Sequence, residues 1–151
     1  MSQLKSELSI EIQEESLSRL AEHARVSIAF TVDRVFDVAP DDASPGGFRL
    51  AERRLPTPYV KDYDAIAGNH PTDWWRVFDL STWGWIAAYR AGRRIGGAMI
   101  ACRASGLPIL AGRSDVAAIW DLRVAPEERR RGVASALFAA VERWAVARGC
   151  R

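Results

Sequence analysis

The residues best suited to chemistry lie close together, in the segment from Ile119 to Ser135. Its pattern predicts a strand, a turn at Pro126, a basic loop with one glycine and the start of a helix. Free N–H groups at a helix N-terminus bind anions, and Gly132 removes a side chain where a phosphate could press against the backbone. Ala134 keeps the next approach open, and Arg129–Arg131 add positive charge. The segment therefore predicts a binding site for a diphosphate.

Two common diphosphate motifs do not fit this segment. A P-loop ends in Gly-Lys-Ser/Thr, and the sequence has no such ending. The dinucleotide fingerprint needs three spaced glycines, and only Gly132 is present. An ordinary strand-to-helix turn with solvated arginines would explain the arginines, but it would not explain the spacing of Gly132 and Ala134.

The pattern Arg129-x-x-Gly132-x-Ala134, preceded by Leu-Arg-Val-Ala-Pro-Glu, resembles the Gln/Arg-x-x-Gly-x-Gly/Ala signature of the GNAT superfamily of N-acetyltransferases. The resemblance covers roughly Ser81 to Cys150, with weaker similarity upstream. The peptide from Lys61 to Asp64, together with that from Trp120 to Val124, looks like the streptothricin acetyltransferase branch.

The resemblance implies that acetyl-CoA is the acetyl donor. In the family the pantetheine arm runs along the fourth strand, where backbone groups of Leu122 and Val124 would pair with it like an added strand. The pyrophosphate would lie on the amides of Arg130–Ser135. The cofactor-binding residues expected from the resemblance are Leu122, Arg123, Val124, Arg129, Arg130, Arg131, Gly132, Val133, Ala134 and Ser135.

The implied reaction is acetyl transfer to a primary amine of a small cationic molecule, with a streptothricin-type antibiotic as the candidate and antibiotic resistance as the role. The N–H of Val124 is the expected donor to the oxyanion. Asp121 and Asp115 are candidates for the base, although Asp121 could equally be a structural carboxylate paired with Arg123. Ala118 stands where several members of the superfamily have a glutamate, so the resemblance assigns no base.

The acceptor site is expected to involve Tyr63, Asp64 and Trp83. The stretch Tyr59–Asp79 is turn-rich, aromatic and acidic, as the wall of a small-molecule pocket often is. A solvated loop with tryptophans against the core is the other interpretation. Acidic residues of this stretch could recognise a cationic amine; they are Asp62, Asp64 and Asp73.

The N-terminal half is expected to hold few regular elements. Apolar spacing predicts a helix over 14–24, followed by a half-buried strand over 26–32 with a bulge near Asp33 and Arg34. A loop over 40–47 and a short strand over 48–55, closed by Pro56 and Pro58, are also expected.

The C-terminal half has clearer patterns. Strands over 83–89 and 94–102 flank a turn at Ala91-Gly92, and the two glycines Gly96 and Gly97 indicate close approach by another backbone. A further strand is predicted over 117–124, and a helix over 131–148 is expected to stop at Gly149. The expected fold is a single α/β domain over 1–151, with a mixed, mostly antiparallel sheet and helices on both faces.

In the family, a fifth strand, a helix and two more strands follow this helix and carry the tyrosine usually offered as general acid. The sequence ends at Arg151, and none of Tyr59, Tyr63 and Tyr89 matches that position. We therefore expect a truncated GNAT fold without the usual C-terminal strands. Its exposed fourth-strand edge could form a homo-oligomer. A catalytically impaired acyl-CoA-binding module is the alternative function.

Composition limits the other classes of function. A net charge of +2 and a small arginine cluster beside Glu127 and Glu128 argue against nucleic acid as a partner. No apolar run approaches the roughly 20 residues of a membrane span, and the polar N-terminus argues against a signal peptide. Cys102 and Cys150 have no metal-ligand spacing, so we expect no metal and two free thiols in a reducing cytoplasm.

Overall fold

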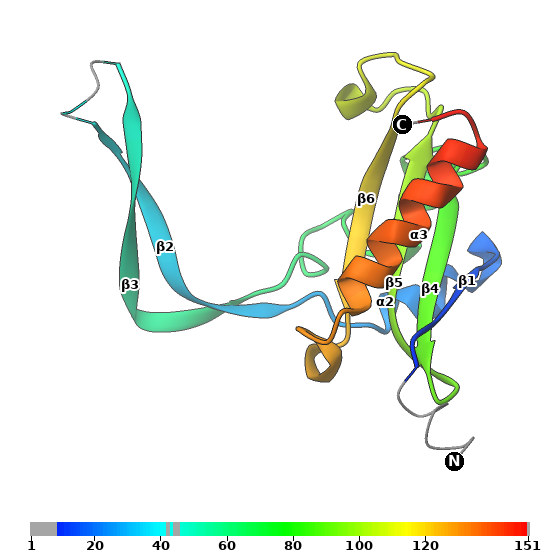
Figure 1. Ribbon diagram of the computed structural model, residues 1–151, viewed down its shortest axis with the longest axis horizontal. Coiled ribbons are helices and arrows are strands. Elements are labelled where there is room, and N and C mark those ends of the chain that lie inside the picture. Colours follow the sequence, from blue (N-terminus) through cyan, green and yellow to red (C-terminus); the bar gives the residue numbers. More distant parts are fainter. Residues whose placement is uncertain (1–8, 42, 44–45, 151) are drawn as a thin grey trace. The chain divides into compact units, whose positions relative to one another are not determined.

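The structure is a computed structural model that describes residues 9–41, 43 and 46–150. Its contacts divide the chain into two compact units, Met1–Ile28 with Asp64–Arg151, and Ala29–Tyr63. The larger unit holds a four-stranded sheet in the order β1-β4-β5-β6, and each neighbouring pair is antiparallel (Figure 1). Its strands are β1 (Glu11–Glu14), β4 (Gly84–Arg90), β5 (Arg93–Cys102) and β6 (Ala117–Val124).

Helices cover both faces of this sheet, as expected. Helix α3 (Val133–Ala147) lies along one face, where Leu137 and Val141 pack against residues such as Ile95 and Ile100. On the other face, Trp85 and Met99 join a second cluster of buried residues. The short helices are η1 (Leu17–Arg19), α2 (Leu20–Ala24), η2 (Pro71–Arg76), η3 (Pro108–Leu110) and η4 (Pro126–Glu128). Among the described residues, no helix is long and apolar enough to cross a membrane.

The predicted hairpin and the strand after it are confirmed. β4 and β5 pair around a turn at Ala91 and Gly92, whose φ angles of 48° and 72° suit a tight hairpin. The expected close approach by another backbone is confirmed at Gly96 but not at Gly97, where the close neighbour is a side chain. A Cβ on Gly96 would lie 2.8 Å from the carbonyl oxygen of Arg123, whereas a Cβ on Gly97 would meet the ring of His23.

The N-terminal expectations need correction. The helix predicted over 14–24 begins only at Leu17, because Glu14 pairs with Ile86 as the last residue of β1. The strand predicted from Val26 begins at Phe30.

The smaller unit is a two-stranded hairpin of β2 (Phe30–Pro40) and β3 (Phe48–Lys61). The predicted bulge is confirmed as a register shift between Val32 and Arg34. The predicted end of the second strand at Pro56 is wrong. The prolines lie between Arg54 and Tyr59, where the register shifts and no paired residue needs their missing N–H. The predicted 40–47 loop includes residues 42, 44 and 45, which lie outside the described residues.

The C-terminal helix begins at Val133 rather than Arg131, because Gly132 has φ 82° and cannot continue a right-handed helix. It ends as predicted: Gly149 has φ 73°, its N–H donates to Val146, and the N–H of Cys150 donates to Ala145. These two bonds form a Schellman motif.

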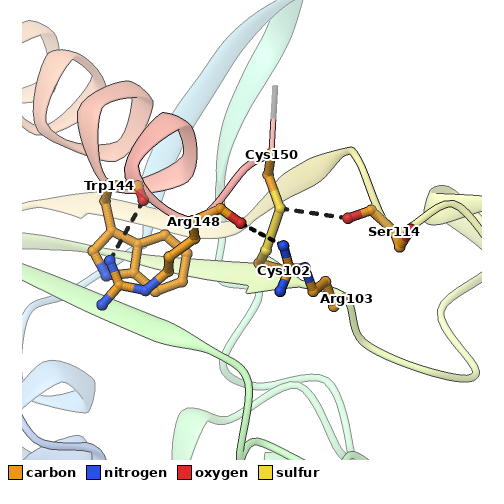
Figure 2. Close-up of a disulfide and its surroundings, with 6 residues drawn as sticks. All are labelled: Cys102, Arg103, Ser114, Trp144, Arg148 and Cys150. Atoms are coloured by element: carbon orange, nitrogen blue, oxygen red, sulfur yellow. Dashed lines mark hydrogen bonds between the residues drawn. A yellow bond between two sulfur atoms is a disulfide. The ribbon is translucent and has the colours of Figure 1, made fainter.

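The expectation of two free thiols is wrong, because Cys102 and Cys150 form a disulfide (Figure 2). Cys102 ends β5 and Cys150 directly follows the helix stop, so the fold brings together residues that are 48 positions apart. The side chain of Arg103 donates to the carbonyl of Arg148 at 2.7 Å beside the disulfide. The bond therefore ties both ends of the segment that contains β6 and α3.

Candidate functional site

An open groove of about 490 Å³ lies between β6 and α3. Three of its lining residues, Leu122, Ala134 and Ser135, are among those expected from the sequence. The other three were missed, although they follow Ser135 at three-, four- and seven-residue spacing, which places them on one face of a helix. These missed residues are Phe138, Ala139 and Glu142. We call this feature the β6–α3 groove.

The edge of β6 offers backbone groups to this groove. β6 ends the order of the four-stranded sheet, so within the described residues it has a strand partner on one side only. The N–H of Ala125 donates to the carbonyl of Ile95 in the preceding strand segment. Because an antiparallel strand points alternate residues to opposite edges, the N–H groups of Leu122 and Val124 point to the free edge.

The start of α3 offers a second set of backbone donors. Gly132 is the N-cap and has no side chain to cap the first turn. The N–H of Ala136 is bonded to Gly132, so the N–H groups of residues 133–135 have no partner within the helix. A Cβ built on Gly132 would meet no atom within 4 Å, which leaves open space at the point where the resemblance puts a phosphate.

The three arginines before Gly132 do not behave alike. Arg129 donates through Nε to the carbonyl of Val124 at 3.0 Å and through a terminal nitrogen to Ser27 at 3.1 Å. Arg131 is exposed, with a terminal nitrogen 3.8 Å from Glu128. Arg130 is exposed and has a φ of 63°. Arg129 therefore fastens the loop to the end of β6, while Arg130 and Arg131 are accessible to an anion.

Two more of the expected cofactor residues serve the core. Val133 is the first residue of α3, and its side chain is buried in the core, so only its backbone N–H is available to a ligand. Arg123 is 2% exposed and its side chain lies in the interior. It donates to both oxygens of Asp121, to both oxygens of Asp64 and to the carbonyl of Val26.

Asp121 belongs to the same buried network. Besides Arg123, it accepts a hydrogen bond from Nε2 of His23 at 2.9 Å. Burial opposes ionisation of this carboxyl, but the hydrogen bonds from Arg123 and His23 outweigh burial and lower its pKa to about 2. Burial likewise opposes the charge on Arg123, and its carboxylate partners nevertheless raise its pKa above the ordinary value. The geometry favours the structural interpretation of Asp121 over the general base.

The three expected substrate residues have different surroundings. Trp83 is buried and packs against Phe78 and Trp120, with ring centroids 5.6 Å away in both cases. Asp64 is paired with Arg123. Tyr63 belongs to the hairpin unit, where it contacts Phe30 and Lys61.

A bulge in β6 was not predicted. Met99 pairs with Asp121 and Ile100 pairs with Ile119, so Trp120 is an extra residue in the strand. A break in alternation could have revealed it, because Trp120 and Asp121 both belong to the face opposite α3. Bulges often lie beside active sites and re-aim neighbouring groups. Here the bulge directly precedes Leu122, which lines the β6–α3 groove.

Solved structures of acetyltransferases are similar to this chain. Nourseothricin acetyltransferase matches with a TM-score of 0.63 and 23% identity, over 93% of this chain and 69% of its own length. A streptothricin acetyltransferase from Bacillus anthracis in complex with acetyl coenzyme A matches with a TM-score of 0.60 and 18% identity, over 92% and 69%. An aminoglycoside N-acetyltransferase in complex with CoA has a TM-score of 0.52 and 21% identity, over 95% and 73%.

At these identities the solved structures show the fold alone. No curated protein matches the sequence. A family model does match it, and this match shows the family. The model of the acetyltransferase (GNAT) family matches residues 49–151, which is more than half of the chain and includes the whole of β6, the loop and α3. The chain belongs to the GNAT family of acetyltransferases.

Proposed function

We propose that this chain transfers the acetyl group of acetyl-CoA to a primary amine of a small cationic molecule, a streptothricin-type antibiotic. The observation that carries the proposal is the continuity of three features of one unit. The free edge of β6, the β6–α3 groove and the open N–H groups at the start of α3 are all formed by this one strand and this one helix. Together they form a surface for an extended ligand with a diphosphate at one end.

The residues present fit such a ligand. The backbone of Leu122 and Val124 would pair with the amides of the pantetheine arm. The N–H groups of 133–135 would bind the pyrophosphate, with Arg130 and Arg131 beside them. When bound, acetyl-CoA would supply a thioester carbonyl that a neutral amine can attack; coenzyme A would leave as a thiolate, which takes up through water the proton that the amine loses.

The described residues offer a donor for the oxyanion of the reaction but only a weak base. The N–H of Val124 points to the free edge, where it would stabilise an oxyanion. Asp121 is ionised at neutral pH, but a carboxylate with a pKa of about 2 is a weak base. We therefore assign Asp121 to positioning, and we assign removal of the amine proton to water at the open groove.

The identity of the acceptor rests on similar proteins. The structures that match with TM-scores of 0.63 and 0.60 are a nourseothricin and a streptothricin acetyltransferase. An aminoglycoside N-acetyltransferase matches with a TM-score of 0.52. All three names point to amine-bearing antibiotics, so we propose that the acceptor is of that class.

A turnover assay tests this proposal. Thiol release from acetyl-CoA would be followed with streptothricin, an aminoglycoside and a polyamine as separate acceptors, and acetylated products would be weighed by mass spectrometry. We expect release that depends on the acceptor and is fastest with streptothricin. Release with no acceptor dependence, or none at all, would contradict the proposal.

A second candidate function is an acyl-CoA-binding module without transfer. It is favoured by the pairing of Asp121 with Arg123 and His23, which leaves this carboxylate a poor base. Tight binding of acetyl-CoA with no acetylated product from any acceptor would select this function.

A homo-oligomer through β6 competes with the proposed function for the same backbone groups. One edge of one strand cannot pair with a second chain and with a pantetheine arm at once. If two copies pair there, acetyl-CoA should dissociate them, and light scattering with and without acetyl-CoA would show it.

A further inference from the structure

We propose that His23 is a positioning residue for acetyl transfer. Its side chain reaches across β5 at Gly97 and binds Asp121, and in this way it fixes the bulge of β6. The inference rests on the proposed function, because the held strand is the one that would seat the acyl group. His23 comes from α2, 98 positions before Asp121, and no local pattern predicts the pairing.

The path of His23 across the sheet depends on a missing side chain. A Cβ on Gly97 would lie 2.6 Å from Nδ1 of His23, so the ring occupies the space that any other residue would fill. His23 has no exposed surface. Gly97 pairs with Arg123, and the next residues along the ladders, Ala98 and Met99, pair with Leu122 and Asp121. The imidazole therefore crosses β5 next to the part of β6 that holds Asp121 and Arg123.

The hydrogen bonds fix the tautomer of His23. An indole N–H can only donate, and Nε1 of Trp85 lies 3.1 Å from Nδ1 of His23. Nδ1 must therefore be the acceptor, and the single proton of the neutral ring is on Nε2, which donates to Asp121. Both nitrogens are used, so the ring has one orientation.

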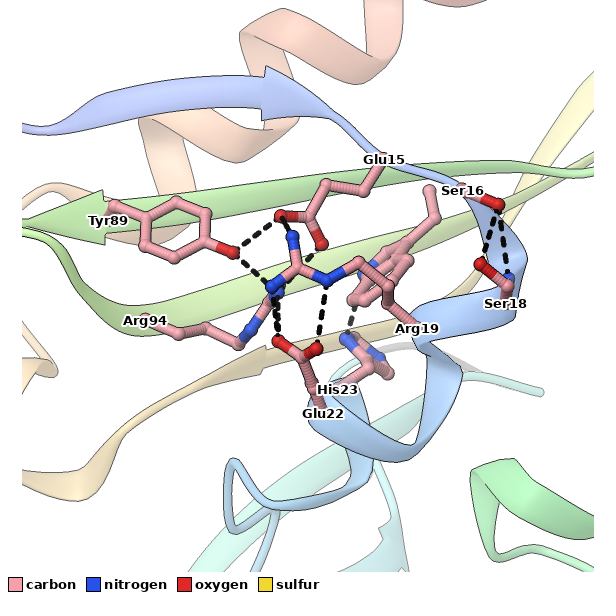
Figure 3. Close-up of polar contacts among 9 residues, drawn as sticks. Glu15, Ser16, Ser18, Arg19, Glu22, His23, Tyr89 and Arg94 are labelled. Atoms are coloured by element: carbon pink, nitrogen blue, oxygen red, sulfur yellow. Dashed lines mark hydrogen bonds and ion pairs between the residues drawn. The ribbon is translucent and has the colours of Figure 1, made fainter.

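The ring of Trp85 also contacts Arg94. The guanidinium of Arg94 lies over its ring at 4.7 Å, and the ring of His23 meets it edge-on at 5.6 Å. Arg94 in turn donates to Glu15 at 2.7 Å and to Glu22 at 3.0 Å (Figure 3). Glu22 precedes His23 in α2, so this polar cluster anchors the helix that carries the imidazole.

At the far end, three donors fix the carboxylate of Asp121. Nε2 of His23 and Nε of Arg123 share Oδ1, each at 2.9 Å, and a terminal nitrogen of Arg123 holds Oδ2 at 2.7 Å. Arg123 is on the same strand as Asp121. Of the residues that donate to this carboxylate, only His23 comes from a helix, α2, that packs on the sheet. Because Asp121 follows the extra residue Trp120, fixing it sets the direction in which the chain enters Leu122 and Val124.

Two substitutions separate the two bonds of the imidazole. In His23→Gln the side-chain amide nitrogen can occupy the place of Nε2 and still donate to Asp121. In His23→Asn the side-chain oxygen can occupy the place of Nδ1 and accept from Trp85, but the link to Asp121 is lost. We expect His23→Asn to lower kcat by about tenfold or more with a smaller change in KM for the amine, since small misplacements of reacting groups are costly. His23→Gln should keep most of kcat.

Gly97→Ala is an independent variant that changes no polar group. Its methyl group would displace the imidazole, so it should resemble His23→Asn. Both variants would be compared at a temperature where circular dichroism shows them folded. Equal kcat for His23→Gln and His23→Asn, or normal kcat for Gly97→Ala, would overturn the inference.

A readout without turnover keeps the two proposals separate. The amide ¹H–¹⁵N signals of Leu122 and Val124 would be recorded in the wild type and in both His23 variants. We expect these signals to move in His23→Asn and to stay near their wild-type positions in His23→Gln. Unmoved signals in His23→Asn would refute the positioning of β6 by His23. Absence of acetyl transfer by the wild type, with the signals behaving as expected, would instead count against the proposed function alone.

Discussion

Arg123 and Asp64 are joined by two hydrogen bonds, at 2.9 and 3.1 Å, from the terminal nitrogens of the guanidinium to the two carboxylate oxygens. Arg123 is the next-to-last residue of β6, and Asp64 begins the second segment of the larger unit. Arg123 also donates to the carbonyl of Val26 at 3.1 Å, near the end of the first segment of that unit. The buried side chain of Arg123 therefore ties β6 to Val26, near the end of the first segment of the larger unit, and to Asp64, at the start of its second segment.

Loss of this guanidinium should strongly destabilise the larger unit. Arg123→Met keeps most of the apolar stem but leaves the carboxylates of Asp121 and Asp64 without their cation. Breaking a buried pair in this way typically costs about 3–5 kcal/mol. Urea unfolding followed by circular dichroism would measure the loss.

Arg113→Met is the matched control. Arg113 also holds a carboxylate through two hydrogen bonds, but its pair with Asp115 is about half exposed. Exposed pairs contribute little, so this variant should unfold near the wild-type urea midpoint. Similar losses in the two variants would show that burial of the Arg123 network is not what stabilises the fold.

Stability should fall as the pH drops below the ordinary pKa of histidine. Burial is the largest influence on His23 and lowers its pKa below the ordinary histidine value of about 6.5, against the opposing effect of Asp121. The unfolded chain therefore binds a proton before the folded chain does. The contribution is complete above about pH 6.5 and declines below it, with a slope of at most about 1.4 kcal/mol per pH unit.

The charged groups that bear on His23 are Asp121, Arg123 and Arg94. The carboxyl of Asp121 does not confuse the measurement, because its folded pKa of about 2 lies below its ordinary 3.8. Its contribution is present above about pH 4 and is lost only as the pH falls towards 2. Urea unfolding between pH 5 and 7.5 would show the slope in the wild type, and His23→Gln should flatten it. An equal slope in both proteins would contradict the prediction.

Reduction of the disulfide should destabilise the protein. The bond closes a loop over a separation of 48 residues, and in the chain-entropy model such a loop contributes about 4 kcal/mol. Thermal unfolding should occur at a lower temperature in the presence of a reductant. The double variant with Cys102→Ser and Cys150→Ser should not respond to the reductant. Alkylation of both thiols in unreduced protein, seen by mass spectrometry, would show that the bond does not form.

The elements that the sequence predicts well are those with a clear local pattern. The helix that stops at Gly149 has continuous helical spacing, and the strand over 117–124 alternates as far as its bulge at Trp120; both elements are found. The hairpin around Ala91 and Gly92 is also found, because alternating strands flank the turn and Gly92 readily adopts the positive φ angle there. The Gly132 and Ala134 motif lies at the helix start, as expected.

What the sequence did not predict depends on pairings between distant residues. Nothing local links His23 to Asp121 or Cys102 to Cys150, and each pair meets only because a helix packs against the sheet. The continuation of β3 past Pro56 was missed for a different reason. A proline ends a regular strand, but here it lies where the register already shifts.

Calorimetry with coenzyme A on Gly132 variants measures whether the start of α3 binds the diphosphate. Gly132 and Gly106 both have positive φ angles, 82° and 78°, and a Cβ on either would meet no protein atom within 4 Å. Substitution to alanine should therefore cost similar backbone strain at both positions, on the order of 1 kcal/mol. Only the Cβ at Gly132 would face the pyrophosphate.

We expect the wild type and Gly106→Ala to bind coenzyme A with the same affinity. Gly132→Ala should bind about tenfold or more weakly, since about 1.4 kcal/mol changes an affinity tenfold. Gly132→Glu, which adds a negative charge at the same point, should show no heat of binding. Equal affinity of Gly132→Glu and the wild type, or no binding by folded wild-type protein, would contradict the claim that the start of α3 holds the diphosphate.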